Sequence, residues 1–267
     1  MQLSWQEGLG INVASLNGSD RTIYIQDMFT RIARRYDLMN RVMTFGQDMR
    51  WRREVIRRAD LPSGGRLLDL GAGTGDLAIE SLHQDPGARP VAADFTPAML
   101  RVGKQRSLAW RVAWSAADAL NLPYPDESFD AVVSGFLLRN VNDLHQALAE
   151  QYRVLRLGGW MVALDTTRPF QNLLSPLVNF HLHKVIPALG SWLAGESEAY
   201  TYLPASTKIF LGAEQLAARM VTTGFEKVGF RRLMLGTIAI HWGCKGDGRT
   251  ITTAAQKTGM QKAREVS

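Results

Sequence analysis

The sequence predicts an α/β protein built on a mostly parallel sheet with helices on both faces, and three observations support this fold class. Residues 66–80 run from an apolar strand through a loop rich in glycine into an amphipathic helix. An isolated acid, Asp94, lies 19 residues beyond Gly75, at the end of a second apolar run. From Pro62 onward strands and helices alternate, which implies parallel strands joined by right-handed crossovers.

The individual elements follow from apolar runs, helical spacing and the glycines between them. We expect strands at 66–71, 90–94, 111–116, 129–135 and 159–165, and helices at 74–84, 97–107, 143–156 and 213–224. Gly158 and Gly159 are interpreted as the stop signal of the third helix. The segments 226–235 and 237–245 flank a turn at Gly236 and predict an antiparallel hairpin at the edge of the sheet.

We expect one domain, with loose segments at both ends and one insertion. Residues 21–60 predict a helical cap of two or three helices, broken near Thr44 to Gln47. Residues 169–207 interrupt the alternation with short apolar helices, which predict either a lid over a substrate or a packing excursion at the sheet edge. The predicted parts are an N-terminal extension at 1–20, the domain at 21–245 and a polar tail at 246–267.

Composition is that of an ordinary globular protein with 267 residues, 46% of them hydrophobic and 21% charged. Cys244 is the only cysteine, so an intrachain disulfide is excluded, and we expect it to be a chemically inert residue near a strand end. The sequence carries neither a signal-peptide pattern nor a continuous apolar run long enough to span a bilayer. These features predict a cytoplasmic protein.

Positive charge is concentrated in residues 21–60, where ten arginines face five acids, a balance of +5 out of +6 for the whole chain. Three interpretations compete: a solvated helical face, a nucleic-acid-binding patch, and a surface for anionic lipid. No recognised RNA-binding or DNA-binding module accompanies the arginines. We therefore expect no nucleic-acid partner.

The glycine loop predicts the kind of ligand. Its glycines fall at Gly71, Gly73 and Gly75, in the spacing G-x-G-x-G, and Asp69 precedes the first by two residues. A carboxylate so close would repel a pyrophosphate but suits a cation such as a sulfonium, which favours S-adenosyl-L-methionine over NAD. The pattern resembles the cofactor loop of class I S-adenosylmethionine-dependent methyltransferases. Asp69, the three glycines and Thr74 are therefore predicted to contact this cofactor.

Further cofactor contacts are expected at the carboxyl ends of the neighbouring strands, where ligands of open α/β sheets bind. Asp94 is placed to accept hydrogen bonds from two ribose hydroxyls. Asp118 is placed to accept from the adenine amino group, and the Ala119 N–H to donate to a ring nitrogen; alternatively, Asp118 only caps a turn. Gly135 ends the fourth predicted strand at the same edge.

Several longer motifs narrow the resemblance. They are YDLMN at 36–40, FGQD at 45–48 with WR at 51–52, LRNV at 138–141, YRVL at 152–155, LGG at 157–159 and AIH at 239–241. In this order, over about residues 23–245, they resemble the menaquinone and ubiquinone biosynthesis C-methyltransferases, close to the demethylmenaquinone type. Leu137 departs from the family pattern, which has glycine there, and residues 164–169 read LDTTRP where the family often has glutamate.

The resemblance implies a methyltransferase domain at 21–245 that moves the sulfonium methyl group to a ring carbon of a reduced prenylated naphthoquinol. Two alternatives stay open: a methyltransferase for another acceptor, such as a sterol, fatty acid or ubiquinone precursor, and a non-catalytic protein that only binds the cofactor. A ring carbon becomes nucleophilic when a ring hydroxyl, of pKa about 10, is ionised. The site therefore needs a group that favours phenolate, and a proton acceptor.

Arg139 is the predicted ionising group, because its charge is fixed and the LRN segment follows the fourth strand. Its alternative role is to pair with a carboxylate such as Asp165 or Asp143 and so to fix the loop. Asn140 is predicted either to orient the ring oxygen or to cap the next helix.

Two further residues and the metal question complete the predicted site. Tyr36 is expected to close over the cofactor, or only to pack. His241 is a candidate proton acceptor near the end of the last strand, although a lone strand histidine is more often structural. His181 and His183 lack further ligands at metal-binding spacing, so no metal site is predicted.

A prenylated substrate resides in a bilayer, which links the arginine-rich segment to function as a hypothesis. The arginines between residues 31 and 58, together with the apolar insertion at 173–194, would form a basic and apolar entrance to the site. This entrance would make transient contact with the inner face of the membrane. A homodimer is compatible with the sequence, which does not set the oligomeric state.

Overall fold

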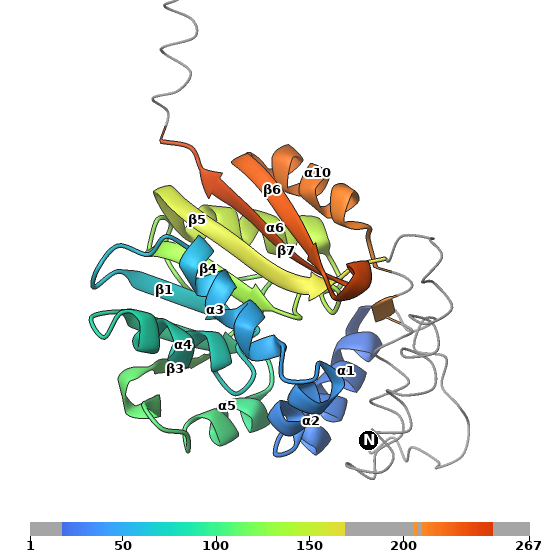
Figure 1. The fold of residues 1–267 in the computed structure, drawn as a ribbon. Coiled ribbons are helices and arrows are strands. Elements are labelled where there is room, and N and C mark those ends of the chain that lie inside the picture. Colours follow the sequence, from blue (N-terminus) through green and yellow to red (C-terminus); the bar gives the residue numbers. More distant parts are fainter. Residues whose placement is uncertain (1–17, 169–205, 208–209, 248–267) are drawn as a thin grey trace, which may run out of the picture.

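The computed structural model describes residues 18–168, 206–207 and 210–247. The predicted insertion at 169–207, the extension at 1–20 and the tail at 246–267 lie almost entirely outside these ranges. Seven strands form one sheet in the order β3-β2-β1-β4-β5-β7-β6 (Figure 1). They are β1 Arg66–Leu70, β2 Arg89–Asp94, β3 Ala113–Ala116, β4 Phe129–Gly135, β5 Leu155–Thr166, β6 Phe225–Leu233 and β7 Ile238–Lys245.

The pairing of the strands confirms the predicted sheet. β3, β2, β1, β4 and β5 pair in parallel, whereas β7 runs antiparallel to both β5 and β6. A single turn of 3₁₀ helix, η4 Met234–Gly236, joins β6 to β7 and so makes the predicted terminal hairpin. The carboxyl ends of β1, β2, β3 and β4 therefore share one edge, and loops that follow them meet there.

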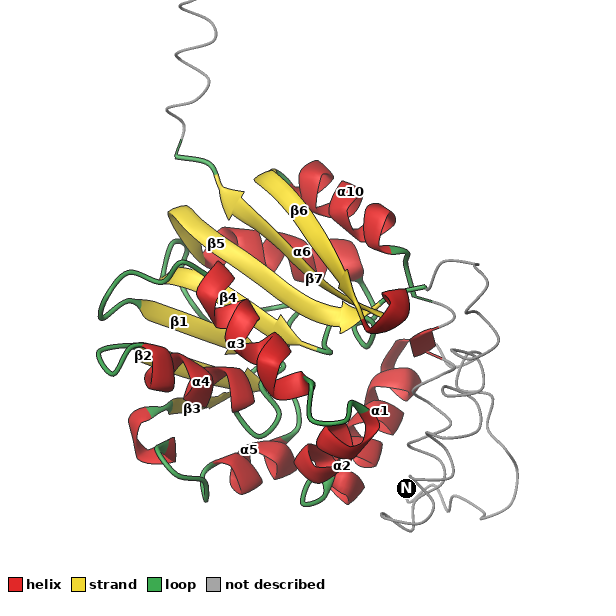
Figure 2. Ribbon diagram, in the orientation of Figure 1, coloured by secondary structure: helices red, strands yellow, loops and turns green. Residues whose placement is uncertain are grey.

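Helices cover both faces of the sheet, as predicted (Figure 2). They are α4 Asp76–Gln84, α5 Pro97–Gly103, α6 Leu144–Val154 and α10 Ala213–Thr223, with the three N-terminal helices described next. Successive side chains of a strand point to opposite faces. Leu67 of β1 accordingly packs in one buried cluster with Leu77 of α4, and Leu68 packs in another with Leu148 of α6 and Leu216 of α10.

Three helices precede the first strand: α1 Gly18–Ile32, α2 Tyr36–Met43 and α3 Asp48–Arg58. The predicted break at 44–47 is confirmed, and Phe45 and Gly46 turn the chain there with φ of 52° and 72°. Val55 and Ile56 of α3 are buried against the sheet, so this helix belongs to the main core. α1 and α2 lie instead at the carboxyl edge of the parallel strands (Figure 1).

Several predicted boundaries were wrong. The helix predicted at 97–107 ends at Gly103. Helix α6 ends at Val154, and β5 begins at the next residue, so Gly158 and Gly159 lie inside the strand. A Cβ on Gly159 would stand 2.7 Å from the Asp130 carbonyl oxygen, and the β4–β5 register shifts between Phe129 and Ala131. Gly159 therefore permits a close approach at a bulge, Gly158 beside it has a φ of 79°, and the pair does not stop the helix.

The third strand also starts later than predicted, at Ala113, because η2 Ala109–Arg111 forms a 3₁₀ turn and Leu108 before it has φ of 66°.

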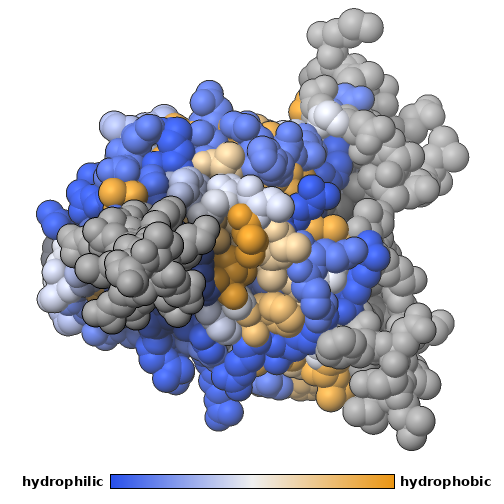
Figure 3. Space-filling view, turned by 90° about the horizontal axis from the view of Figure 1, so that it is seen from above, coloured by the Kyte–Doolittle hydropathy of each residue, from blue (hydrophilic) through white to orange (hydrophobic). Residues whose placement is uncertain are grey.

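Seen from above, the described surface is mostly hydrophilic, and apolar residues gather in a smaller area near the middle of that face (Figure 3). No helix within the described ranges is long and apolar enough to cross a bilayer.

Candidate active site

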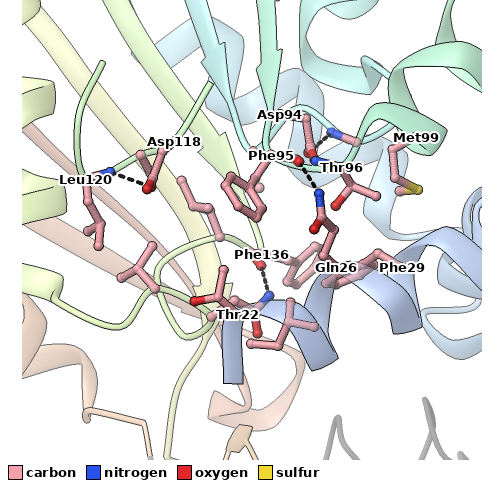
Figure 4. Close-up of a pocket in the computed structure, with 18 of the residues that line it drawn as sticks. Thr22, Gln26, Phe29, Asp94, Phe95, Thr96, Met99, Asp118, Leu120 and Phe136 are labelled. Carbon is pink, nitrogen blue, oxygen red and sulfur yellow. Dashed lines mark hydrogen bonds between the residues drawn. The ribbon is translucent and has the colours of Figure 1, made fainter. Parts of the chain in front are cut away.

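A cavity of about 200 Å³ lies where the loops after the parallel strands meet α1 and α2 (Figure 4). Its sheet side is lined by residues predicted to bind the cofactor: Gly71, Gly73, Asp94, Asp118, Ala119 and Gly135. The opposite side comes from α1 and from the loop between β4 and α6, and is lined by Thr22, Ile25, Gln26, Phe29, Phe136, Leu137, Asn140, Val141 and Asn142.

The glycine loop takes a backbone conformation that favours glycine, and neighbouring side chains pack closely on it. Gly71 and Gly73 have φ of 65° and 57°, a conformation that residues with a Cβ rarely adopt. A Cβ on Gly73 would stand 3.1 Å from the Met99 Cε, and one on Gly71 would stand 2.8 Å from the Leu137 Cδ1. Leu137, the residue that replaces the family glycine, therefore packs directly on the loop.

Asp94 holds the glycine loop from the end of β2. One carboxylate oxygen accepts a hydrogen bond from the Gly73 N–H at 2.7 Å, and the other accepts from the Thr96 N–H at 2.7 Å. Burial raises the pKa of Asp94, and these two backbone donors oppose that shift. The carboxylate is fixed in orientation and still faces the cavity, which fits the predicted ribose contact.

Asp118 lines the cavity after β3 and also caps a turn, so both of its predicted roles are compatible with the structure. Its Oδ1 accepts a hydrogen bond from the Leu120 N–H at 2.9 Å (Figure 4). The side chain is exposed, and Ala119 beside it is buried at the cavity wall.

Three predicted cofactor residues do not line the cavity. The Asp69 carboxylate turns to α4 and accepts from the Ala78 N–H at 2.9 Å, where burial raises its pKa to about 7. The Thr74 hydroxyl donates to Asp37, and Gly75 lies against the Trp114 ring. In this structure these three residues contact the supports of the loop and not the cavity, and their direct contact with the cofactor stays a prediction.

A partly buried ionic network, which the sequence analysis missed, joins the N-terminal helices to the glycine loop. The Thr74 Oγ1 lies 2.7 Å from the Asp37 Oδ1 and 3.2 Å from the Arg106 Nη1. Arg106 contacts Asp76 at 2.6 Å, and Arg52 contacts the same carboxylate at 2.9 Å. Although burial works against ionisation, the two arginines lower the pKa of Asp76. Asp37 belongs to the YDLMN motif and Arg52 to the WR motif, so these motifs were the sequence signal from which the network could have been predicted.

Arg139 is paired with Asp165, one of the two carboxylates considered above. Its Nη1 lies 2.5 Å from the Asp165 Oδ1, its backbone N–H donates to the Asp165 Oδ2 at 3.2 Å, and both side chains are buried. The guanidinium lies 5.0 Å from the ring centre of Phe136. Phe136 lines the cavity, whereas Arg139 does not. Asp143 instead caps α6 by accepting from the Gln146 N–H.

Asn140 and Tyr36 reach the cavity. The Asn140 Nδ2 donates to the Phe136 carbonyl at 3.0 Å, so the carboxamide is oriented within the loop. Tyr36 stands at the start of α2 with its ring edge-on to Phe29 at 5.8 Å, and burial raises the pKa of its hydroxyl. Tyr36 is therefore a neutral hydroxyl beside the glycine loop at physiological pH.

His241 does not line the cavity, so nothing in the described residues supports its predicted role as proton acceptor. It is 1% exposed in β7, and its Nε2 is 3.0 Å from the Ala213 carbonyl oxygen. Burial lowers the pKa of the imidazole. His241 therefore serves the packing of β7 against α10. Cys244 is also buried in this strand.

The contribution of α1 was missed because its sequence was interpreted through its charge. Phe29 and Ile25 line the cavity, and the Gln26 Nε2 donates to the Phe95 carbonyl at 2.9 Å (Figure 4).

Seven of the ten arginines of residues 21–60 are exposed: Arg31, Arg34, Arg35, Arg41, Arg50, Arg53 and Arg57. Arg52 is buried in the ionic network, so the arginines do not form one surface.

A sheet in this order, with a glycine loop after β1 and an acid after β2 facing one cavity, defines a class I methyltransferase, whose methyl donor is S-adenosylmethionine. Solved structures share the fold. The cyclase SpnF superposes with a TM-score of 0.62 at 18% identity, covering 87% of this chain and 98% of that one. Phosphoethanolamine N-methyltransferase 2 of Haemonchus contortus, in complex with S-adenosylmethionine, gives 0.53 at 17% identity, covering 71% and 50%.

Sequence comparison identifies the family. Residues 17–245 match the ubiE/COQ5 methyltransferase family, and the chain belongs to it. A ubiquinone/menaquinone biosynthesis C-methyltransferase of Desulfotalea psychrophila is 47% identical over 221 residues, covering 83% of this chain and 90% of the relative. A demethylmenaquinone methyltransferase of Thermus thermophilus is 43% identical over 218 residues, covering 81% and 99%. The predicted family, fold class and enzyme class are confirmed.

Proposed function

We propose that this enzyme methylates a ring carbon of a reduced prenylated naphthoquinol of the demethylmenaquinol type. The observation that carries the proposal is a single cavity with two unlike sides. One side holds the carboxylates of Asp94 and Asp118, whereas the described lining of the other has no charged side chain and presents Phe29, Phe136 and Val141 among uncharged polar groups. The names of the relatives support a quinol acceptor, and these apolar side chains suit a planar aromatic ring.

The side with the two carboxylates would hold the methyl donor. The backbone of the glycine loop would approach it at Gly73, the Asp94 carboxylate would accept from the ribose hydroxyls, and Asp118 and Ala119 would contact the adenine. When bound, S-adenosylmethionine supplies a methyl group on a positively charged sulfur, which makes that carbon electrophilic. Tyr36 bounds the cavity on the same side and would limit the access of water.

Asn140 is proposed to bind the ring oxygen of the acceptor, because it is the polar side chain of the LRN segment that reaches the cavity. Arg139 is proposed to act from behind the Phe136 ring, where it orients Asn140 through the loop and adds a fixed positive charge. Its pairing with Asp165 offsets much of that charge. A donated hydrogen bond favours phenolate and raises electron density at the ring carbon. Water is proposed to accept the ring proton after transfer.

Incubation of the purified enzyme with labelled S-adenosylmethionine and reduced demethylmenaquinol tests the proposal. We expect a quinone product heavier by one methyl group on the ring, identified by mass spectrometry. Sterol, fatty-acid and ubiquinone-precursor acceptors run in parallel separate the alternative methyltransferases. Binding of S-adenosylmethionine without methylation of any quinol would reject the catalytic proposal in favour of an accessory protein.

We also propose transient contact between the α1–α2 region and an anionic membrane surface. Leu38 and Phe45 are 53% and 72% exposed on α2 and the turn after it. Arg34 and Arg35 are exposed close by in sequence, and α1 and α2 lie at the cavity end of the sheet (Figure 1). Basic residues around exposed apolar side chains suit an interface with anionic headgroups. The apolar segment 173–194 lies outside the described residues.

Replacing Arg31, Arg34 and Arg35 with glutamine tests this contact. At about 1 kcal/mol per basic residue near an anionic surface, vesicle binding should fall by up to about a hundredfold at low salt. Turnover of long-tailed quinol should fall, while turnover of a short-tailed soluble analogue should persist.

The matched control replaces three exposed basic residues elsewhere, Arg89, Lys104 and Arg219, with glutamine. This variant has the same net charge and should bind vesicles more strongly than the first. Equal loss of activity on both acceptors in the first variant would contradict the membrane contact.

A further inference from the structure

Helix α1 is fastened to the walls on both sides of the cavity. On one side, the Gln26 Nε2 donates to the carbonyl of Phe95, the residue after the ribose-binding acid. On the other side, Arg21 donates to backbone carbonyls of the loop between β4 and α6. The two attachments are five residues apart on the helix, and between and beyond them Ile25 and Phe29 face the cavity.

Arg21 grips this loop at three points. Its Nη2 donates to the Arg139 carbonyl at 3.1 Å, and its Nη1 donates to the Val141 carbonyl at 3.2 Å and to the Asn142 Oδ1 at 3.1 Å. The two carbonyls flank Asn140. A guanidinium suits this task because its donors are fixed in one plane, so the distance between two acceptors is set by the side chain.

The loop is held on its other side by the sheet. The Asp165 carboxylate accepts from both the backbone N–H and the guanidinium of Arg139. Residue 139 is therefore anchored through its N–H and side chain by β5 and through its carbonyl by α1. Asn140 follows this doubly anchored residue, and its N–H donates to the Leu137 carbonyl at 2.8 Å.

We propose that Arg21 is a positioning residue for methyl transfer. Its fork sets the backbone on both sides of Asn140 and thereby couples the seating of α1 over the cavity to the orientation of the Asn140 carboxamide. The kinetic consequence rests on the proposed function; the structural coupling does not. Asn142 contributes to the same attachment, since its Nδ2 donates to the Thr22 hydroxyl at 2.6 Å and to the Gly18 carbonyl at 3.0 Å.

The test compares Arg21→Gln with Arg21→Lys in the full chain. Small misplacement of a catalytic group costs up to about a hundredfold in rate, so we expect kcat to fall at least about tenfold in Arg21→Gln. Lysine offers one point charge in place of a fork and should restore only part of kcat. The dissociation constant for S-adenosylmethionine should change by less than about threefold, because the bonds of Asp94 to Gly73 and Thr96 remain.

Hydrogen exchange supplies a readout that is independent of turnover. Amides of residues 136–143 should exchange faster in Arg21→Gln than in the wild type, while those of β1 and β4 keep their protection. The control is Thr30→Ala on the same helix, an exposed residue whose hydroxyl bonds within α1, to the Gln26 carbonyl. This control should match the wild type in both measurements.

Three outcomes would overturn the inference. These are unchanged exchange in 136–143 with unchanged kcat, an Arg21→Lys variant equal to the wild type, and equal effects in Thr30→Ala. If the wild-type enzyme methylates no quinol, the proposed function fails while the exchange experiment still decides the coupling. If Arg21→Gln does not fold, Asn142→Ala removes one part of the attachment; faster exchange in the loop then supports the inference, and unchanged exchange contradicts it.

Discussion

Replacing Asp94 with alanine should weaken binding of S-adenosylmethionine without unfolding the protein. An ionised carboxylate has about four acceptor positions, and Asp94 already accepts from the Gly73 N–H, the Thr96 N–H and the Thr96 side chain. The acceptor capacity that remains is available to a ribose hydroxyl. Asp94 therefore both holds the glycine loop and offers the ligand its remaining acceptors.

The expected size follows from these bonds. A hydrogen bond to a charged group contributes about 1.5–3 kcal/mol. Loss of even one bond to the ligand raises the dissociation constant by about 10-fold to 150-fold, and release of the Gly73 N–H adds to the loss. Asp94→Asn should rescue little, because its amide nitrogen would face one of the two backbone donors.

Titration calorimetry with S-adenosylmethionine measures the effect, and Asp85→Ala is the matched control. Asp85 also accepts from two backbone N–H groups, those of Gly64 at 2.8 Å and Gly87 at 2.7 Å, but it lies before β2, at the opposite edge of the sheet. Its loss should lower stability and leave cofactor affinity unchanged. A folded Asp94→Ala protein with wild-type affinity would remove Asp94 from the site and refute the reasoning.

Two further predictions concern buried ionisable groups. Arg139→Ala leaves the Asp165 side chain, which is 1% exposed, without its guanidinium partner, so the unfolding free energy should fall by about 3–5 kcal/mol. Adding Asp165→Asn to the same chain should recover part of this free energy while kcat stays low. If denaturant titration shows no recovery, the result would contradict the pairing. Burial raises the pKa of Asp69 from 3.8 to about 7, so its contribution to stability is complete below pH 4 and is lost as pH rises through 7. The unfolding free energy of the wild type, compared with Asp69→Asn, should therefore decline between pH 4 and 8, and a constant difference would argue against a raised pKa.

Local patterns predicted the strands that are buried on both faces and the loop between β1 and α4. Apolar runs such as those of β1 and β4 carry their own signal, and the glycines mark a conformation that few other residues adopt. Gly158 and Gly159 were misinterpreted because a glycine pair marks a helix end and a bulge equally well. The deciding contact, the approach of Gly159 to the Asp130 carbonyl, comes from a strand more than 20 residues away.

The sequence predicted that the candidate cofactor residues lie at one edge of the sheet, but not the direction of each side chain. Spacing placed Asp69 and Asp94 at the ends of adjacent strands. Only the packing of β1 against α4 shows that the Asp69 carboxylate turns to the Ala78 N–H and away from the cavity. For Arg139 the sequence left a catalytic role and a carboxylate partner open, and the structure supplies the partner.

The arginines of residues 21–60 illustrate why charge counting cannot assign function. Arg52 is buried with Asp76 and so joins α3 to the start of α4, directly after the glycine loop. Arg21 faces the loop that carries Asn140. In both places one guanidinium satisfies several acceptors that water would otherwise solvate, which is a structural use of charge.

Two attachments of the N-terminal helices lie on different sides of the cavity. Asp37, at the start of α2, accepts from the Thr74 hydroxyl and so holds the glycine loop, whereas Arg21, on α1, holds the Asn140 loop. The N-terminal helices thus contact the proposed cofactor side and the proposed acceptor side through separate groups. Because in-line methyl transfer requires the sulfur, the methyl carbon and the acceptor carbon to align, a segment that sets both sides determines their relative position. The N-terminal segment is, on this argument, part of the active site as much as the sheet edge is.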